Sequence, residues 1–179
     1  MTDRECGSCS MCCKLLYIEE LAKPPGVWCP HVVRGQGCGI YETRPTPCRG
    51  FRCRWLMLPD LDDRWRPDRC GFLLWWVDER VLMVVVEPTK PDAWKRQPFY
   101  GQLKEWSKTA ITGVGMVVIK VRNDATVLFP HADVFIGDVG IDDKVGAGAD
   151  KVGLQRRAWV KVSRRDGSVK RFDAGFIPA

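Results

Sequence analysis

Cysteine is the residue type in this chain whose number and spacing could do chemistry. The sequence contains nine cysteines, and eight of them lie between Cys6 and Cys53. Four of the eight form the run Cys6-x-x-Cys9-x-x-Cys12-Cys13, in which small residues let the backbone fold tightly. Cysteines separated by two residues can bind one ion, as in zinc knuckles, and a C-x2-C-x2-C run also holds [4Fe–4S] clusters in bacterial ferredoxins. The spacing predicts a metal site and is compatible with either metal.

The neighbouring residues Cys12 and Cys13 indicate more than one centre. Side chains of adjacent residues point to opposite faces of an extended strand, and they diverge by about 100° in a helix. One ion is therefore poorly placed to bind both thiols. We expect Cys12 and Cys13 to serve two centres, or one of them to be a spare thiol.

The other four cysteines of the cluster are Cys29, Cys38, Cys48 and Cys53. Thr46 followed by Pro47 is typical of a helix start and predicts that Cys48 lies in the first turn of a short helix. The positive end of the helix dipole, together with Arg49 and Arg52, should then lower the pKa of the Cys48 thiol.

The geometry of Cys48 and Cys53 depends on where this helix ends. The two cysteines are five positions apart, which separates them by about 140° on an unbroken helix. They can meet at one ion only if Gly50 ends the helix early. Both arrangements are compatible with the sequence.

Two blocks of this cluster resemble a known family, the YkgJ-type cysteine-cluster proteins, which are described as zinc- or iron-chelating. The first block is the C-x2-C-x2-C-C signature itself. The second is Cys29 followed by Cys38-x-Ile40-Tyr41-Glu42-x-Arg44-Pro45-x-x-Cys48-Arg49-x-Phe51-x-Cys53. The resemblance covers residues 6–53 and implies that all eight cysteines are metal ligands. A related cluster in flagellin lysine methylases resembles an iron–sulfur site, but no region of this chain matches their methyl-donor machinery.

Three further residues are weaker candidates for a role in metal binding. Cys70 falls outside the eight, and we expect a buried or unused thiol there. His31 follows Cys29 by two positions and could complete a zinc centre, although with eight thiols available a surface or supporting role is favoured. Arg44 is expected to position the cysteine loop, with the option of donating hydrogen bonds to ligand sulfurs.

Composition favours a folded protein in a reducing compartment. The chain has 179 residues, of which 45% are hydrophobic and 28% are charged, a balance typical of globular proteins. The first residues carry two acids and reach Cys6 before any apolar run, and no stretch approaches the roughly 20 apolar residues that span a bilayer. We therefore expect a cytoplasmic protein with no membrane partner, in which clustered cysteines are metal ligands more often than disulfides.

The rest of the chain predicts an α+β fold, with a cysteine-rich metal-binding module of short helices and loops followed by β-hairpins packed with one or two helices. We place the module at residues 1–70 and an α+β region of unknown role at residues 71–179, unless the two pack as one domain. A helical stretch interrupted by Pro98 is expected over residues 91–111, and Gly146 to Ala149 are expected to form a flexible loop. Three hairpins are predicted from apolar runs around turn residues, at residues 72–86, 116–129 and 159–172.

No catalytic set stands out in the sequence. The two histidines are His31 and His131, and His131 beside Pro130 is expected to be a solvent-facing turn residue. A further group of aspartates matches no calcium loop, and we expect these acids to be solvated: Asp133, Asp138, Asp142 and Asp143. The sequence leaves open whether the protein is an enzyme, and an enzyme of this design would have to use the metal.

The sequence favours a metal-binding protein without an assigned biochemical role. Zinc is the narrow first choice, because four-cysteine sites are typical of structural zinc and eight cysteines make two such sites. An iron–sulfur cluster, in a redox protein or a metal-dependent enzyme, is the alternative. A zinc-dependent nucleic-acid-binding protein is the third hypothesis, suggested by the net charge of +6. It is less favoured, because eight thiolates binding two Zn²⁺ would lower that charge to +2.

Overall fold

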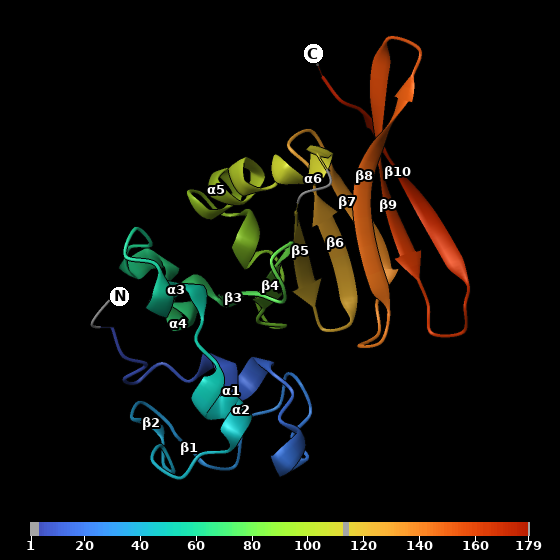
Figure 1. The fold of residues 1–179 in the computed structure, drawn as a ribbon. Helices are drawn as coiled ribbons and strands as arrows, with labels where there is room; N and C mark the ends of the chain where they lie inside the picture. Colours follow the sequence, from blue (N-terminus) through green and yellow to red (C-terminus); the bar gives the residue numbers. More distant parts are fainter. Residues whose placement is uncertain (1–3, 113–114, 179) are drawn as a thin grey trace. The chain divides into compact units, whose positions relative to one another are not determined.

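The chain folds into two compact units. The computed structural model describes residues 4–112 and 115–178. The first unit comprises Met1–Trp75 and Val85–Trp94, and the second comprises Trp76–Val84 and Lys95–Ala179. Short helices and loops dominate the N-terminal part of the chain, and long strands dominate its C-terminal part (Figure 1). The predicted α+β class is therefore confirmed.

The first unit is built from short elements. None of its helices exceeds five residues in the described part of the chain, and a two-stranded sheet joins β1 to β2. Gly71 adopts a left-handed conformation (φ 88°) and ends the last of these helices, which is the usual role of glycine after a helix. The elements up to that point are α1 (Met11–Leu15), η1 (Glu19–Leu21), β1 (Val32–Val33), β2 (Gly37–Cys38), α2 (Thr46–Gly50), α3 (Arg54–Met57), η2 (Asp63–Trp65) and α4 (Pro67–Cys70).

Apolar burial in the first unit is concentrated after the cysteine cluster. Among residues 4–52, the buried apolar side chains other than Cys29 are Met11, Leu15 and Ile18. After Cys53, the unit buries a larger set: Trp55, Leu56, Leu61, Trp65, Phe72, Leu73, Leu74, Val86, Ala93 and Trp94. The cluster segment by itself therefore has little hydrophobic stabilisation.

The strands beyond Phe72 form two sheets. One has five strands in the order β3-β4-β5-β6-β7, and the other has three in the order β10-β9-β8. All three predicted hairpins are present as strands, although the third is longer than expected. The strands are β3 (Phe72–Trp76), β4 (Val81–Val86), β5 (Met116–Val121), β6 (Asp124–Leu128), β7 (Asp133–Asp138), β8 (Lys144–Val152), β9 (Gln155–Ser163) and β10 (Val169–Phe176).

The hydrophobic core of the second unit is formed by side chains from β5, β6, β7 and β9. Valine and alanine side chains of β5, β6 and β7 pack in one cluster with Ala158, Val160 and Val162 of β9, and Phe129 in that cluster is fully buried. The alternation of buried and exposed positions along β9 has the period of two that a half-buried strand requires. The outer face of β9 consequently carries polar and aromatic side chains.

The prediction of a flexible loop at Gly146 to Ala149 is wrong. These residues lie within β8 and pair with β9 along its whole length. Ala147 and Ala149 pack against the core on one face. On the other face Gly148 lies beneath Trp159, where a Cβ atom would come within 2.9 Å of the indole. Glycine is thus required there by a partner in another strand and does not mark flexibility.

The predicted helical stretch forms in three pieces: η3 (Ala93–Lys95), α5 (Phe99–Trp106) and α6 (Thr109–Thr112). Pro98 separates the first piece from α5, as predicted. Leu103 of α5 is buried. Lys104 of the same helix forms an ion pair with Asp133, in which Nζ lies 2.7 Å from Oδ1. Across residues 4–112 and 115–178, no helix has the length and apolar character needed to cross a membrane.

Candidate metal centre

The first cysteine group lies on a turn followed by a short helix. The amide of Cys9 donates to the carbonyl of Cys6 (2.9 Å), with Gly7 in the turn between them at φ +50°. Cys12 and Cys13 then lie in α1, which is anchored because Met11 and Leu15 are buried. Two buried residues four positions apart lie on the same side of a helix, so they set the rotation of α1 and with it the directions of both thiols.

The thiols of Cys12 and Cys13 lie next to each other. Their sulfurs are 4.0 Å apart, within reach of a weak hydrogen bond. That hydrogen bond raises the pKa of Cys12, and burial raises it further. The same bond lowers the pKa of Cys13 to about 7 against the opposing effect of burial, and Lys23 and Arg44 lower it too. Cys13 is thus the thiol of this pair that loses its proton first.

The second group is joined to the first through backbone contacts. Cys29 is buried, and its amide donates to the carbonyl of Cys13 (3.0 Å). Cys38 lies in β2, where Gly37 at φ +108° approaches the first cysteine turn so closely that a Cβ atom would be 2.5 Å from the carbonyl oxygen of Gly7. The chain can return to Cys6 at this point because residue 37 is glycine.

Cys48 and Cys53 lie on different elements. Cys48 is in α2, near its start as predicted, although Pro45 rather than Thr46 is the residue before the helix. α2 ends at Gly50, and Cys53 is the residue before α3. The condition under which these two thiols could approach one ion, an early end of the helix at Gly50, is therefore met.

The prediction of a lowered pKa at Cys48 is wrong. Burial raises the pKa of this thiol, and the nearby thiols of Cys13, Cys29 and Cys38 raise it further. Arg49, which was expected to oppose this, points its guanidinium toward Thr46 Oγ1 (3.5 Å). Helix α2 is only five residues long, so its dipole is too small to offset desolvation and the crowding of thiols.

Burial governs most other thiols of the cluster. It raises the pKa of Cys6 and Cys9, and it raises the pKa of Cys53 to about 11. Arg44 opposes the rise at Cys6. Arg44 does not donate to a sulfur in the structure: its Nη1 donates to the carbonyl of Tyr41 (2.6 Å), and its guanidinium stacks 3.6 Å from the centre of the Tyr41 ring. Its effect on the thiols is electrostatic.

The thiols fall into two electrostatic neighbourhoods. Cys6 and Cys9 raise the pKa of both Cys12 and Cys53. Cys13, Cys29 and Cys38 raise the pKa of Cys48. The neighbourhoods overlap at the adjacent residues Cys12 and Cys13, because Cys13 also raises the pKa of Cys12 and of Cys6.

Lys23 is a residue of this site that the sequence did not reveal. Its side chain is buried, and its Nζ donates to the carbonyls of Lys14 (3.0 Å), Leu16 (2.5 Å) and Pro24 (2.8 Å). Burial lowers the pKa of this amine, whereas the thiols of Cys29 and Cys13 raise it. A single lysine before two prolines has no pattern that marks it as a buried cation beside thiols, so sequence reasoning had no signal to use.

The thiols do not form a closed coordination shell. Among residues 4–112 and 115–178, no group of three or more His, Cys, Asp or Glu side chains is arranged to hold a metal ion. All nine cysteines are in the described ranges, and no disulfide joins any two of them. The donor chemistry nevertheless fits a thiophilic metal, since thiolates are the preferred ligands of zinc and of iron–sulfur clusters.

Cys70 and His31 lie outside the two neighbourhoods. Cys70 is fully buried, as expected, and its thiol lies 3.1 Å from the carbonyl of Phe72. The carbonyl of His31 accepts from the amide of Gly39 (2.8 Å). His31 therefore lies beside the residue that follows Cys38.

The second unit corrects two further expectations. His131 is half-buried and not solvent-facing: its Nε2 lies 2.9 Å from the carbonyl oxygen of Ala174. Of the four aspartates, Asp133, Asp138 and Asp142 are exposed, as expected, whereas the side chain of Asp143 is largely buried. Asp133 pairs with Lys104, and Asp143 pairs with Arg164 at 2.7 Å.

Comparisons with known proteins add no relative to this description. No family model matches the chain, and it matches no curated protein and no solved structure. The resemblance to the YkgJ-type proteins therefore stays a prediction carried by the two cysteine blocks.

Proposed function

We propose that residues 6–53 form a metal-binding module that holds zinc, or alternatively an iron–sulfur cluster, through eight cysteines. The observation that carries the proposal is that eight cysteines without a disulfide lie on a turn, α1, β2, α2 and the loops between them, where Cys6 and Cys9 raise the pKa of Cys12 and where Cys13, Cys29 and Cys38 raise the pKa of Cys48. Thiolates that lie close to one another are costly to form unless a cation joins them. A bound metal removes that cost.

The two neighbourhoods support two centres of four cysteines each. We assign Cys6, Cys9, Cys12 and Cys53 to one centre. We assign Cys13, Cys29, Cys38 and Cys48 to the other. The division separates Cys12 from Cys13, which are adjacent in α1, and it assigns Cys48 of α2 and Cys53, the residue before α3, to different centres.

Bound zinc would cross-link the short elements of this segment, whereas a bound cluster would add electron transfer. Lys23 and Arg44 would partly neutralise the thiolates, since both lower the pKa of Cys13. A cytoplasmic location would keep these thiols reduced and ready to bind. Nucleic acid is not the ligand we propose for this module, because Arg44 acts on the thiols by lowering the pKa of Cys6 and Cys13.

Anaerobic purification followed by metal and sulfide analysis tests the proposal. We expect about two zinc ions for each chain and a colourless protein, because zinc thiolates do not absorb visible light. Stoichiometric iron and sulfide with brown absorption would replace zinc by the iron–sulfur alternative. A protein that contains no metal and takes up neither zinc nor iron would refute the module itself.

Alanine variants test the assignment of ligands. Cys9→Ala and Cys48→Ala should each lose about half of the bound metal, because each removes one of the four ligands of a different centre. Cys70→Ala should keep the full metal content, since its thiol is fully buried against the backbone of Phe72. Metal analysis of the three purified variants measures this.

The same series carries its own control. All three variants remove one thiol, so a general effect of losing a cysteine would lower metal content equally in each. Equal loss from Cys70→Ala would show that the eight-ligand set is wrong. Complete loss from both Cys9→Ala and Cys48→Ala would point to a single centre.

A further inference from the structure

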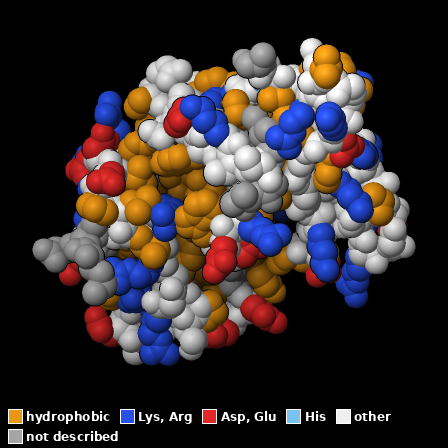
Figure 2. All heavy atoms as spheres, turned by 45° about the horizontal axis from the view of Figure 1, so that its top comes forward, with side chains coloured by type: hydrophobic (Ala, Val, Ile, Leu, Met, Phe, Trp, Pro, Cys, Tyr) orange, Lys and Arg blue, Asp and Glu red, His pale blue; other side chains and the backbone are white. Residues whose placement is uncertain are grey.

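The outer face of the three-stranded sheet belongs to the second unit, whereas the cysteine cluster belongs to the first. Along β9 the side chains of Ala158, Val160 and Val162 are buried, so Arg157, Trp159 and Lys161 project from the other face. The strand register brings Asp150 of β8 opposite Arg157, and Asp173 of β10 opposite Trp159. All these residues belong to the second unit. Lys and Arg side chains recur over the right-hand part of Figure 2, the side on which Figure 1 draws the C-terminal strands.

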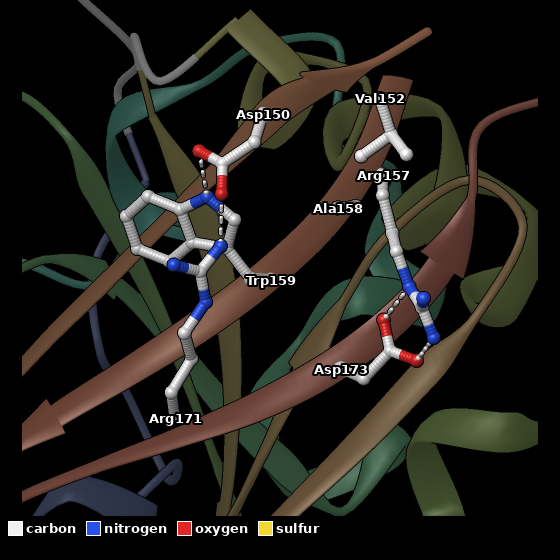
Figure 3. A pocket seen from close by; sticks show the side chains of 7 residues that line it. All are labelled: Asp150, Val152, Arg157, Ala158, Trp159, Arg171 and Asp173. Atoms are coloured by element: carbon white, nitrogen blue, oxygen red, sulfur yellow. Dashed lines mark hydrogen bonds and ion pairs between the residues drawn. The ribbon is translucent and has the colours of Figure 1, made fainter. Parts of the chain in front are cut away.

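Trp159 is the centre of this face. Its ring lies across Gly148, and the guanidinium of Arg171 lies over the ring, 4.7 Å from its centroid. Asp150 accepts from Trp159 Nε1 (3.0 Å) and also pairs with Arg171, so one carboxylate holds both members of the stack (Figure 3). The stack is therefore a planar platform, in which the planar cation is the outer layer.

A hollow lies beside this platform. Arg157 and Asp173 form a second ion pair across it, in which Arg157 Nε donates to Asp173 Oδ1 (2.8 Å). The hollow has a volume of ≈ 330 Å³ and is lined by the two ion pairs together with Trp159 and Val152 (Figure 3). That volume is at the lower end of the range found for small-ligand sites. One planar ring can thus enter beside the stack.

The charge of the face favours an anion. Both acids, Asp150 and Asp173, are engaged by arginines. Lys144 and Lys161 lie on the same face of the strands, and among the described residues neither has a carboxylate within ion-pair distance. The two lysines therefore supply the uncompensated positive charge of this face.

We propose that this face binds single-stranded nucleic acid. A base enters the hollow and stacks next to the Arg171–Trp159 platform. The backbone phosphates then lie near Lys144 and Lys161. Proteins that bind single strands combine these two features, because every base offers a π-face and every nucleotide a phosphate. An acidic peptide would pair with the two lysines, but it would leave the hollow beside the planar platform unfilled. A duplex would keep its bases stacked inside and away from the platform.

Fluorescence anisotropy of a labelled 15-residue oligothymidylate with the full-length, metal-loaded protein tests the proposal. Lys161→Glu should weaken binding by about tenfold and lower the slope of log K against log salt by about 0.7, the value for one lost phosphate contact. Lys151→Glu is the matched control. It makes the same charge change at an exposed position of β8 on the opposite face, opposite Arg156, and should change affinity less than about twofold.

A second probe tests stacking. An abasic oligonucleotide of the same length should bind about fivefold or more weakly, because it keeps the phosphates and loses the bases. Circular dichroism of both variants confirms that they fold. The proposal is overturned if no binding is seen, if the two variants weaken binding equally, or if the abasic strand binds as well as the normal one. Tighter binding to duplex DNA, heparin or phosphatidylserine vesicles would also overturn it. Loss of metal from a Cys48→Ala variant should leave this binding intact.

Discussion

Removal of the bound metal should unfold the segment from Cys6 to Cys53 while the strands of the second unit stay folded. The segment buries only Met11, Leu15 and Ile18 as apolar anchors before Cys53, and its helices have at most five residues. Such short elements do not offset the chain entropy lost on folding. Structural zinc contributes roughly 10–16 kcal/mol of apparent binding free energy in small modules, which is enough to offset the chain entropy lost when this segment folds.

Hydrogen exchange measured by mass spectrometry before and after chelation locates the effect. Amides of residues 6–53 should exchange fast after chelation, whereas β5, β6, β9 and β10 should keep their protection because Val127, Phe129, Val160 and Val162 supply a core without metal. Adding zinc back should restore the protection of the cluster segment alone. Loss of protection throughout the chain would mean that one cooperative domain depends on the metal.

The second large effect is expected at Phe129. Its side chain is 0% exposed in the core of the second unit, so Phe129→Ala should lower the free energy of unfolding of that unit by about 3–5 kcal/mol. This loss combines the transfer of the ring out of water with the cavity left behind, and it is large against a typical domain stability of about 5–15 kcal/mol. Urea unfolding followed by circular dichroism measures it.

Phe135 is the matched control for Phe129. It is the same residue type in the same unit, on β7, but it is 62% exposed. Phe135→Ala should therefore change stability by about 0.5 kcal/mol or less. Both variants should keep the full metal content, because the cysteines belong to the other unit. Metal loss in Phe129→Ala would contradict the independence of the two cores.

Local sequence signals predicted the strands whose own residues favour extended backbone. The runs at Phe72–Trp76, Val81–Val86 and Met116–Val121 are rich in β-branched and aromatic residues, and turn residues separate them from their partners. Such residues favour extended backbone wherever the strand is packed. The break at Pro98 is likewise set by the residue itself.

The strand β8 depends on its neighbour β9. β8 contains the alternation of glycine and alanine that local rules assign to a loop, and it is ordered because β9 offers nine paired residues and an indole above Gly148. The sequence also suggested one division of the chain after residue 70, whereas the structure divides it after Trp75, Val84 and Trp94. Long-range pairing decides such features, and no window of local sequence contains it.

The chemistry of the candidate site divides in the same way. The sequence by itself determined which atoms are available, since eight closely spaced thiols in a chain without clustered histidines define a soft donor set. Only the tertiary structure decided which thiols share a neighbourhood, that Cys48 has a raised pKa, and that the buried Lys23 amine acts on Cys13. Proton affinity and electrostatic coupling depend on burial and on distances through space, and these quantities exist only once the chain has folded.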